Sequence, residues 1–191
     1  DYTRLNRGKA IFLLAIPMVL EMIMESVFAI VDIFFVSKLG SDAIAAVGLT
    51  ESMMTVVYAI AVGFSAGTTA LVSRRIGEKD PKAAARAAGQ SILAGLVVSF
   101  LLAIPGIFYS YELLRLMGAS HELASINHGY TQIMFAGNAV IMMLFIINAA
   151  FRSAGDAALS MRVLLIANGI NIILDPLLIF GYGTIPPLGI E

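Results

Sequence analysis

Long stretches without a charged side chain are the feature that most constrains the fold of this chain. Three stretches, of 22, 25 and 29 residues, contain no Asp, Glu, Lys or Arg: 52–73, 87–111 and 123–151. Two more apolar stretches, 10–36 and 159–180, contain only a few charged residues. A helix of about 20 apolar residues crosses the hydrocarbon core of a bilayer. Lipid offers no hydrogen-bond partners to the backbone, so only helices and closed barrels can span it. Because these stretches lack the alternation of apolar and polar residues that barrel strands show, they predict membrane-spanning helices.

The composition excludes several classes of protein. Hydrophobic residues make up 59% of the 191 residues and charged residues 13%, against about 45–50% and about 25% in soluble domains. The net charge of −1 leaves no basic surface for a nucleic acid, and the absence of Cys excludes disulfides and thiolate metal sites. The composition therefore predicts an integral membrane protein and disfavours a soluble enzyme.

The polar joints divide the chain into five helices. Turn and cap residues, such as the run Gly77-Glu-Lys-Asp-Pro81, separate the apolar stretches. The predicted fold is an all-α bundle of five spanning helices within a single unit over residues 1–191. The expected helices cover about 10–36, 44–72, 83–108, 123–151 and 157–180.

The basic residues predict an orientation in the membrane. Ten of the twelve Lys and Arg residues lie in the N-terminal segment or in the second and fourth joints, whereas Lys38 and Arg115 lie in the other joints. By the positive-inside rule, the N-terminus and the second and fourth joints face the cytoplasm. We expect the protein to lie in the plasma (inner) membrane.

Carboxyl groups occur in or near the predicted membrane-spanning helices, where an ionised group is energetically unfavourable. An acid at the bilayer centre costs about 2.5–3.5 kcal/mol on insertion scales, and we expect no Lys or Arg deep in a span to neutralise these groups. Five lie in or near the predicted helices: Glu21, Glu25, Asp32, Glu51 and Asp175. The first three fall on one face of the first helix, as Asn168, Asn171 and Asp175 do on the fifth. These faces, with a polar stripe that begins at Glu51 on the second helix, predict a shared wet interior.

Asp32 and Asp175 are the strongest candidates for an ion site. Both lie four or five residues before the outer end of their helix, so they are expected at similar depth. Pro176 leaves carbonyls of the preceding turn unpaired, and Asn171 supplies an amide one turn before Asp175. Such oxygen ligands suit a hard cation or a shared proton. For Asp32 the alternative is a carboxylate that only reaches the membrane interface.

Other polar and small residues have more than one interpretation. Glu25, two turns inward of Asp32, is a candidate relay or substrate contact. Glu51 is a candidate for the same polar interior or for the interface, and Asn168 either joins this network or bonds two helices together. The small-residue pattern Gly63-Phe-Ser-Ala-Gly67 predicts close helix packing.

Several motifs in order resemble one transporter family. The runs Val31-Asp-Ile-Phe-Phe-Val-Ser-Lys-Leu-Gly40, Arg152-Ser-Ala-Gly-Asp156 and Asn168-Gly-Ile-Asn-Ile-Ile-Leu-Asp-Pro176 resemble the N-terminal half of multidrug and toxic compound extrusion (MATE) transporters. The resemblance implies five helices of an N-lobe in a twelve-helix, two-lobe protein. We therefore expect the chain to be a fragment whose missing partners are a sixth helix and a C-lobe.

The resemblance also implies a function and a set of residues. It implies export of amphipathic, drug-like organic compounds, coupled to H⁺ or Na⁺, by alternating access. It therefore also implies a protein that is not an enzyme and that binds no cofactor other than the coupling ion. It assigns ion coupling to Asp32, Asn171 and Asp175, and a surrounding hydrogen-bond network to Tyr130 and Asn148. The position of Asn148, only four residues before Arg152, puts it nearer the cytoplasm than Asp32, in disagreement with that assignment.

Other functions remain open at this point. A lipid-linked oligosaccharide flippase of the same superfamily is the first alternative, although a pyrophosphate would favour basic residues in the cavity. An intramembrane hydrolase would need a catalytic pair, which Asp32 and Asp175 could imitate. A helical scaffold without transport would have no reason to keep five acids in its spans. The sequence leaves the coupling ion and the substrate undetermined.

Overall fold

A computed structural model describes residues 7–181, 186–187 and 189. Three of its helices begin with a side-chain cap. Asp80, Ser120 and Asp156 each accept a hydrogen bond from the backbone N–H three residues later, at 2.9–3.1 Å, which satisfies a donor that a helix start leaves free. The helices are α1 (Arg7–Val36), the 3-10 turn η2 (Ser37–Leu39), α2 (Ser41–Gly77), α3 (Pro81–Phe108), α4 (Ser110–Leu116), α5 (His121–Ala136), α6 (Asn138–Ser153) and α7 (Ala157–Phe180).

The predicted all-α fold class is confirmed. Five segments are long and apolar enough to cross a membrane, and the described residues contain no strand. The expected helix over 123–151 is divided, because α5 ends at Ala136 and α6 begins at Asn138. The buried Asn138 amide donates to the carbonyls of Phe135 (2.6 Å) and Ser99 (3.1 Å). Such a side-chain bond competes with the backbone hydrogen bonds of the helix and accounts for the break. The short helix α4 is a second feature that the sequence did not predict.

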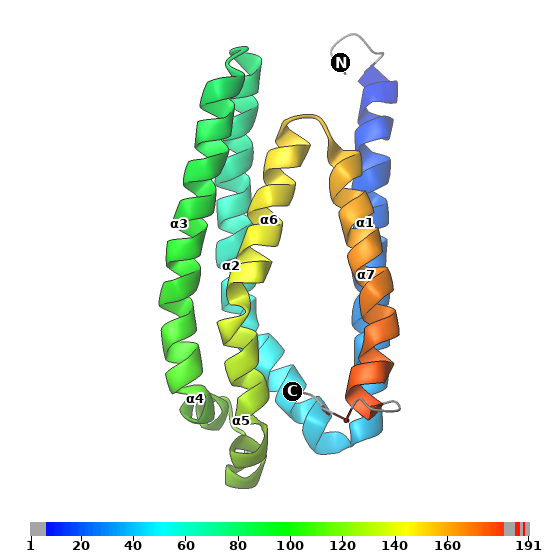
Figure 1. The fold of residues 1–191 in the computed structure, drawn as a ribbon, viewed down its shortest axis with the longest axis vertical. Helices are drawn as coiled ribbons and strands as arrows, with labels where there is room; N and C mark the ends of the chain where they lie inside the picture. Colours follow the sequence, from blue (N-terminus) through cyan, green and yellow to red (C-terminus); the bar gives the residue numbers. More distant parts are fainter. Residues whose placement is uncertain (1–6, 182–185, 188, 190–191) are drawn as a thin grey trace.

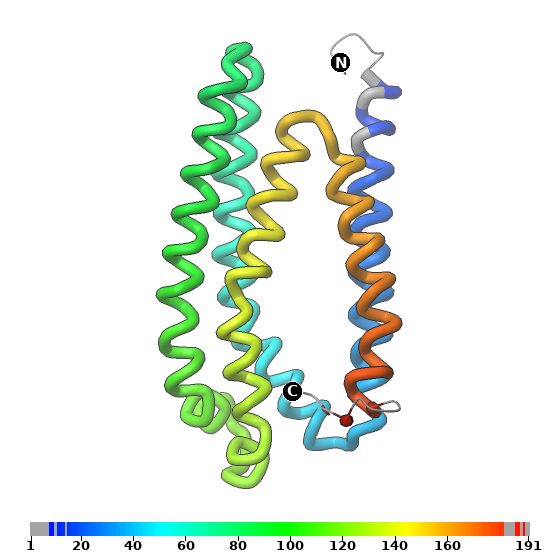
Figure 2. Tube along the Cα trace, viewed as in Figure 1, coloured from blue at the N-terminus to red at the C-terminus, as the bar shows by residue number. Residues whose placement is uncertain are grey.

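The helices form two groups (Figure 1). α1 lies along α7, whereas α2, α3 and the α5–α6 segment pack together. The groups are joined by η2 at one end and by the α6–α7 turn at the other (Figure 2). The start of α1, the α2–α3 hairpin and the α6–α7 turn all lie at one end, so the basic segments gather there. That this end faces the cytoplasm stays a prediction, and Arg4, part of its basis, lies outside the described residues.

The small-residue pattern on α2 does not serve close packing. A Cβ atom placed on Gly63 or Gly67 would meet no atom of the described residues within 4 Å. Within the part of the chain that the structure describes, the prediction of close packing there is therefore wrong. These two glycines instead line a groove between α2 and α3, because the neighbouring helix α3 passes without covering them.

Gly106 on α3 is a glycine at which close packing does occur. A Cβ atom there would overlap the Cβ and ring atoms of Phe135 on α5, and Gly106 is buried. Overpacking of this kind costs about 1–3 kcal/mol. We expect Gly106→Ala to lower the free energy of unfolding by that amount, measured by SDS titration in micelles. Gly89→Ala is the control, since its Cβ meets nothing within 4 Å, and equal effects of the two would contradict the prediction.

Candidate functional site

Three cavities between the two helix groups contain the carboxyl groups of α1, α2 and α7. The smallest, about 180 Å³, is lined by residues of α1, α2, α5 and α7 and is named the Asp32–Asp175 cavity. The Glu51 cavity, about 420 Å³, lies between α1 and α2. The Glu21 cavity, about 580 Å³, lies mainly between α1, α2 and α6. The polar interior is thus a series of spaces along α1.

Asp32 and Asp175 line the smallest cavity together. Tyr130 of α5 lines it as well, and it also packs against the buried cluster that contains Val36 and Val47. Both aspartates are half-buried, and Asp175 Oδ2 has no hydrogen-bond partner among the described residues. Two carboxylates in so small a space repel each other unless a proton or a cation is shared between them. The geometry therefore suits a proton or a hard cation.

The two asparagines of α7 lie differently. Asn168 is buried, and its Nδ2 has no partner among the described residues, whereas Asn171 is exposed and lines none of the three cavities. Seven residues make nearly two full helical turns, so Asn168 follows the direction of Asp175 more closely than Asn171 does. The structure brings Asp32 and Asp175 together without Asn171, whose role as a ligand stays a prediction.

Glu51 belongs to a neighbouring space. Tyr58 Oη donates a hydrogen bond to Glu51 Oε2 at 3.4 Å, within the stripe on α2 that the sequence indicates. Asp32 lines both this cavity and the Asp32–Asp175 cavity. The carboxyl group of Asp32 thus lies between the two spaces, with an acid on α2 to one side and an acid on α7 to the other.

Arg152 reaches the third cavity, which the sequence did not predict. Its Nη1 lies 3.3 Å from Glu21 Oε1, and the Glu21 side chain is only 7% exposed. The prediction that no basic side chain would neutralise the acids is therefore wrong for Glu21, because a long Arg side chain carries its charge well away from the helix end. Glu25 and the buried Asn148 line the same cavity. Asn148 thus lies apart from the Asp32–Asp175 cavity, as its place in the sequence suggests.

Comparison with known proteins identifies the family. The model of the MatE family matches residues 17–177. The chain belongs to the MatE family. The resemblance to MATE transporters seen in the sequence motifs is thereby confirmed.

Individual relatives of the chain are described as transport or export proteins. A FAD transporter of Shewanella oneidensis is 31% identical over 185 residues, which cover 96% of this chain and 41% of that protein. The multidrug export protein MepA of Staphylococcus aureus is 27% identical over 175 residues, covering 91% and 39%. A solved MOP superfamily transporter from Pyrococcus furiosus superposes with a TM-score of 0.87 at 31% identity, covering 99% of this chain and 41% of the other. The chain thus spans about two fifths of the length of these proteins.

Proposed function

We propose that this chain is the ion-coupling part of an antiporter that exports amphipathic organic compounds in exchange for H⁺ or Na⁺. The observation that carries the proposal is the shared cavity of Asp32 and Asp175, with Tyr130 in its wall. A cation or proton bound there removes the repulsion between the two carboxylates. Because α1 and α7 each supply one of them, the bound ion changes how strongly these helices are held together. This is the differential interaction that coupling requires.

The Glu21 cavity is the candidate space for the transported compound. Met18, Met22 and Phe145 give it apolar walls, and methionine adapts to ligands of different shape. Two carboxylates, Glu21 and Glu25, face one guanidinium group there. This balance favours an amphipathic compound with a positive charge. Asn148, which lines the same cavity, is a candidate hydrogen-bonding contact to it.

Two alternative functions, an oligosaccharide flippase and an intramembrane hydrolase, would use the charged residues of these cavities differently. An oligosaccharide flippase that binds pyrophosphate gains a possible contact in Arg152, but Glu21 already pairs with that side chain and Glu25 adds a second negative charge. An intramembrane hydrolase would use Asp32 and Asp175 as a catalytic pair, and turnover of peptide substrates would reveal it. The family membership favours transport over both, and the proposed location is the plasma membrane with a cytoplasmic N-terminus.

The experiment is ion-driven transport by the full-length protein in proteoliposomes. A fluorescent cationic dye is loaded, and Na⁺ and pH gradients are imposed separately. We expect one of the two gradients to accelerate dye movement and to identify the coupling ion. Dye movement that responds to neither gradient would contradict the proposal.

A further inference from the structure

A groove on the α2–α3 hairpin lies apart from the three cavities. It has a volume of about 550 Å³, and its walls are mostly apolar. At about 100° per residue, Gly67 and Leu71 lie on the side of α2 opposite to Glu51, so the groove faces away from the proposed transport site. It is lined by Ile60, Gly63, Phe64, Gly67, Thr68 and Leu71 of α2 and by Gln90, Ser91 and Ala94 of α3.

The shape of the groove suits a hydrocarbon chain. Gly63 and Gly67 leave open space where other residues would have a Cβ atom, and the remaining wall is largely aliphatic or aromatic. Lipid tails are as apolar as these side chains, however, so burial in the groove provides little driving force by itself. Selective binding of one lipid must therefore come from the polar end of the groove.

Two unpaired cations continue the α3 wall toward that end. Lys82, Arg86, Gln90 and Ala94 follow one another at intervals of four residues, so they lie along one side of α3. Lys82 and Arg86 are exposed, and neither makes an ion pair or a side-chain hydrogen bond with the described residues. Like charges one turn apart repel each other. An anionic group between them would remove this repulsion and accept charge-assisted hydrogen bonds.

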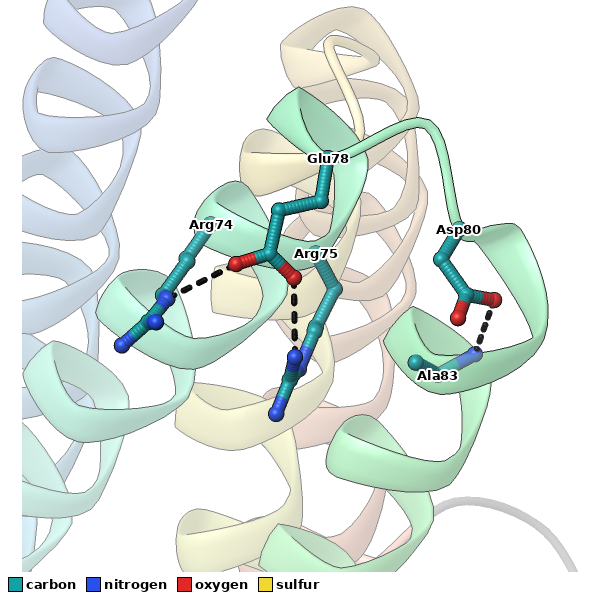
Figure 3. Close-up of polar contacts among 5 residues, drawn as sticks. All are labelled: Arg74, Arg75, Glu78, Asp80 and Ala83. Atoms are coloured by element: carbon teal, nitrogen blue, oxygen red, sulfur yellow. Dashed lines mark hydrogen bonds and ion pairs between the residues drawn. The ribbon is translucent and has the colours of Figure 1, made fainter.

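The acids of the hairpin do not supply that anion. Glu78 binds Arg74 Nε at 2.9 Å and Arg75 Nη1 at 2.8 Å, and Asp80 caps α3 through Ala83 (Figure 3). The hydrogen bonds from both arginines hold the pKa of Glu78 below its usual range, so Glu78 stays ionised and committed to them. Residues 74–86 contain five basic and two acidic side chains. The hairpin therefore keeps an excess of positive charge at the mouth of the groove.

We propose that this groove is a binding site for an anionic phospholipid, with its phosphate at Lys82 and Arg86 and one acyl chain along Gly67 and Gly63. Gln90 lies four residues after Arg86, a rise of about 6 Å. With the phosphate at Arg86, the glycerol and ester groups come level with Gln90, whose amide donates to an ester carbonyl. Basic residues beside an apolar membrane surface are the pattern that recognises anionic headgroups. The site does not depend on the proposed transport function.

Fluorescence quenching tests the site directly. These 191 residues contain no Trp, so Leu71→Trp places a single reporter in the groove once any Trp elsewhere in the full-length protein is replaced by Phe. The full-length protein is embedded in nanodiscs of phosphatidylcholine with a minor fraction of phosphatidylglycerol, and one of the two lipids is brominated in its acyl chains. We expect brominated phosphatidylglycerol to quench this Trp several-fold more strongly than its share of the lipid predicts. Ile166→Trp, on the exposed face of α7, is the control reporter and should show no preference.

Charge variants then identify the headgroup contacts. We expect Lys82→Gln and Arg86→Gln each to lower the phosphatidylglycerol preference at the Leu71→Trp reporter by roughly fivefold. Arg162→Gln, an exposed basic residue on α7, should leave it unchanged. Glu78→Gln should raise it, because it frees Arg74 and Arg75, and a folding defect would not have this effect.

Three results would overturn the proposal. Equal quenching by the two brominated lipids would mean that the groove holds bulk lipid only. Absence of quenching by either would mean that protein covers the groove. A preference that persists in Lys82→Gln and Arg86→Gln would mean that the headgroup binds elsewhere. Gly67→Leu, which fills the groove, should reduce quenching by both lipids.

Discussion

Asp32→Asn and Asp175→Asn are each expected to reduce ion-driven export by the full-length protein to the rate of protein-free liposomes. Asn keeps the size of Asp and its ability to accept a hydrogen bond, but it cannot bind a proton and is a weaker ligand for Na⁺. Each single substitution should be sufficient, because the two carboxyl groups line one cavity of about 180 Å³ and act on the same ion. Dye efflux under the effective gradient measures the result.

The control for this pair is Asp42→Asn. Asp42 is exposed in the first turn of α2 and lines none of the three cavities, so its loss should leave transport unchanged. Expression and melting temperature of all variants separate a coupling defect from a folding defect. Ion-driven efflux that survives in both Asp32→Asn and Asp175→Asn would show that the coupling ion binds elsewhere.

The asparagines of α7 allow a finer test of the same site. Asn168 is buried and lies on nearly the same side of α7 as Asp175, whereas Asn171 is exposed. If the conformation described above binds the ion, Asn168→Ala should weaken coupling more than Asn171→Ala does. Comparison of the ion concentration that gives half-maximal efflux in the two variants distinguishes them. The reverse order would restore Asn171 to the ligand set that the family resemblance implies.

The spans and the Asp32–Asp175 pairing could be predicted because they depend on one-dimensional quantities. Apolar length sets the number of crossings, and the distance of each aspartate from its helix end sets its depth. The choice between Asn168 and Asn171 depends on the rotation of α7 about its axis. Both asparagines lie within the polar sector, so only packing against α1 and α6 decides which one is buried.

Other features depend on contacts between distant segments. The break before Asn138 requires the carbonyl of Ser99 as a partner, and the run 123–151 has no charge that would reveal it. The glycines of α2 read as a packing motif, yet whether a neighbour fills the space depends on how α3 crosses. Arg152 carried a usable signal, because it lies four residues after Asn148 and thus on the same side of α6. Its partner, Glu21, is 131 residues away.

The second large effect is expected at the Glu21–Arg152 pair. Arg152→Met leaves the Glu21 carboxylate, 7% exposed, without a neutralising partner, and Glu21 Oε2 already lacks a hydrogen bond among the described residues. Loss of one partner of a buried pair costs about 3–5 kcal/mol. We expect about 3 kcal/mol, the lower end, because Arg152 is 27% exposed and its pairing is partly screened. SDS titration of the purified full-length protein in micelles measures the free energy of unfolding.

A double variant tests whether the Glu21–Arg152 ion pair contributes to stability or whether the two side chains only lie close together. Glu21→Leu with Arg152→Met removes both charges, and such replacements of buried pairs are commonly neutral or stabilising. We therefore expect the double variant to be more stable than Arg152→Met alone by about 2 kcal/mol or more. Arg74→Met is the control, since its pair with Glu78 is exposed, and it should change stability little. Additive effects of Glu21→Leu and Arg152→Met would show that the two side chains do not interact and that this ion pair does not link α1 to α6.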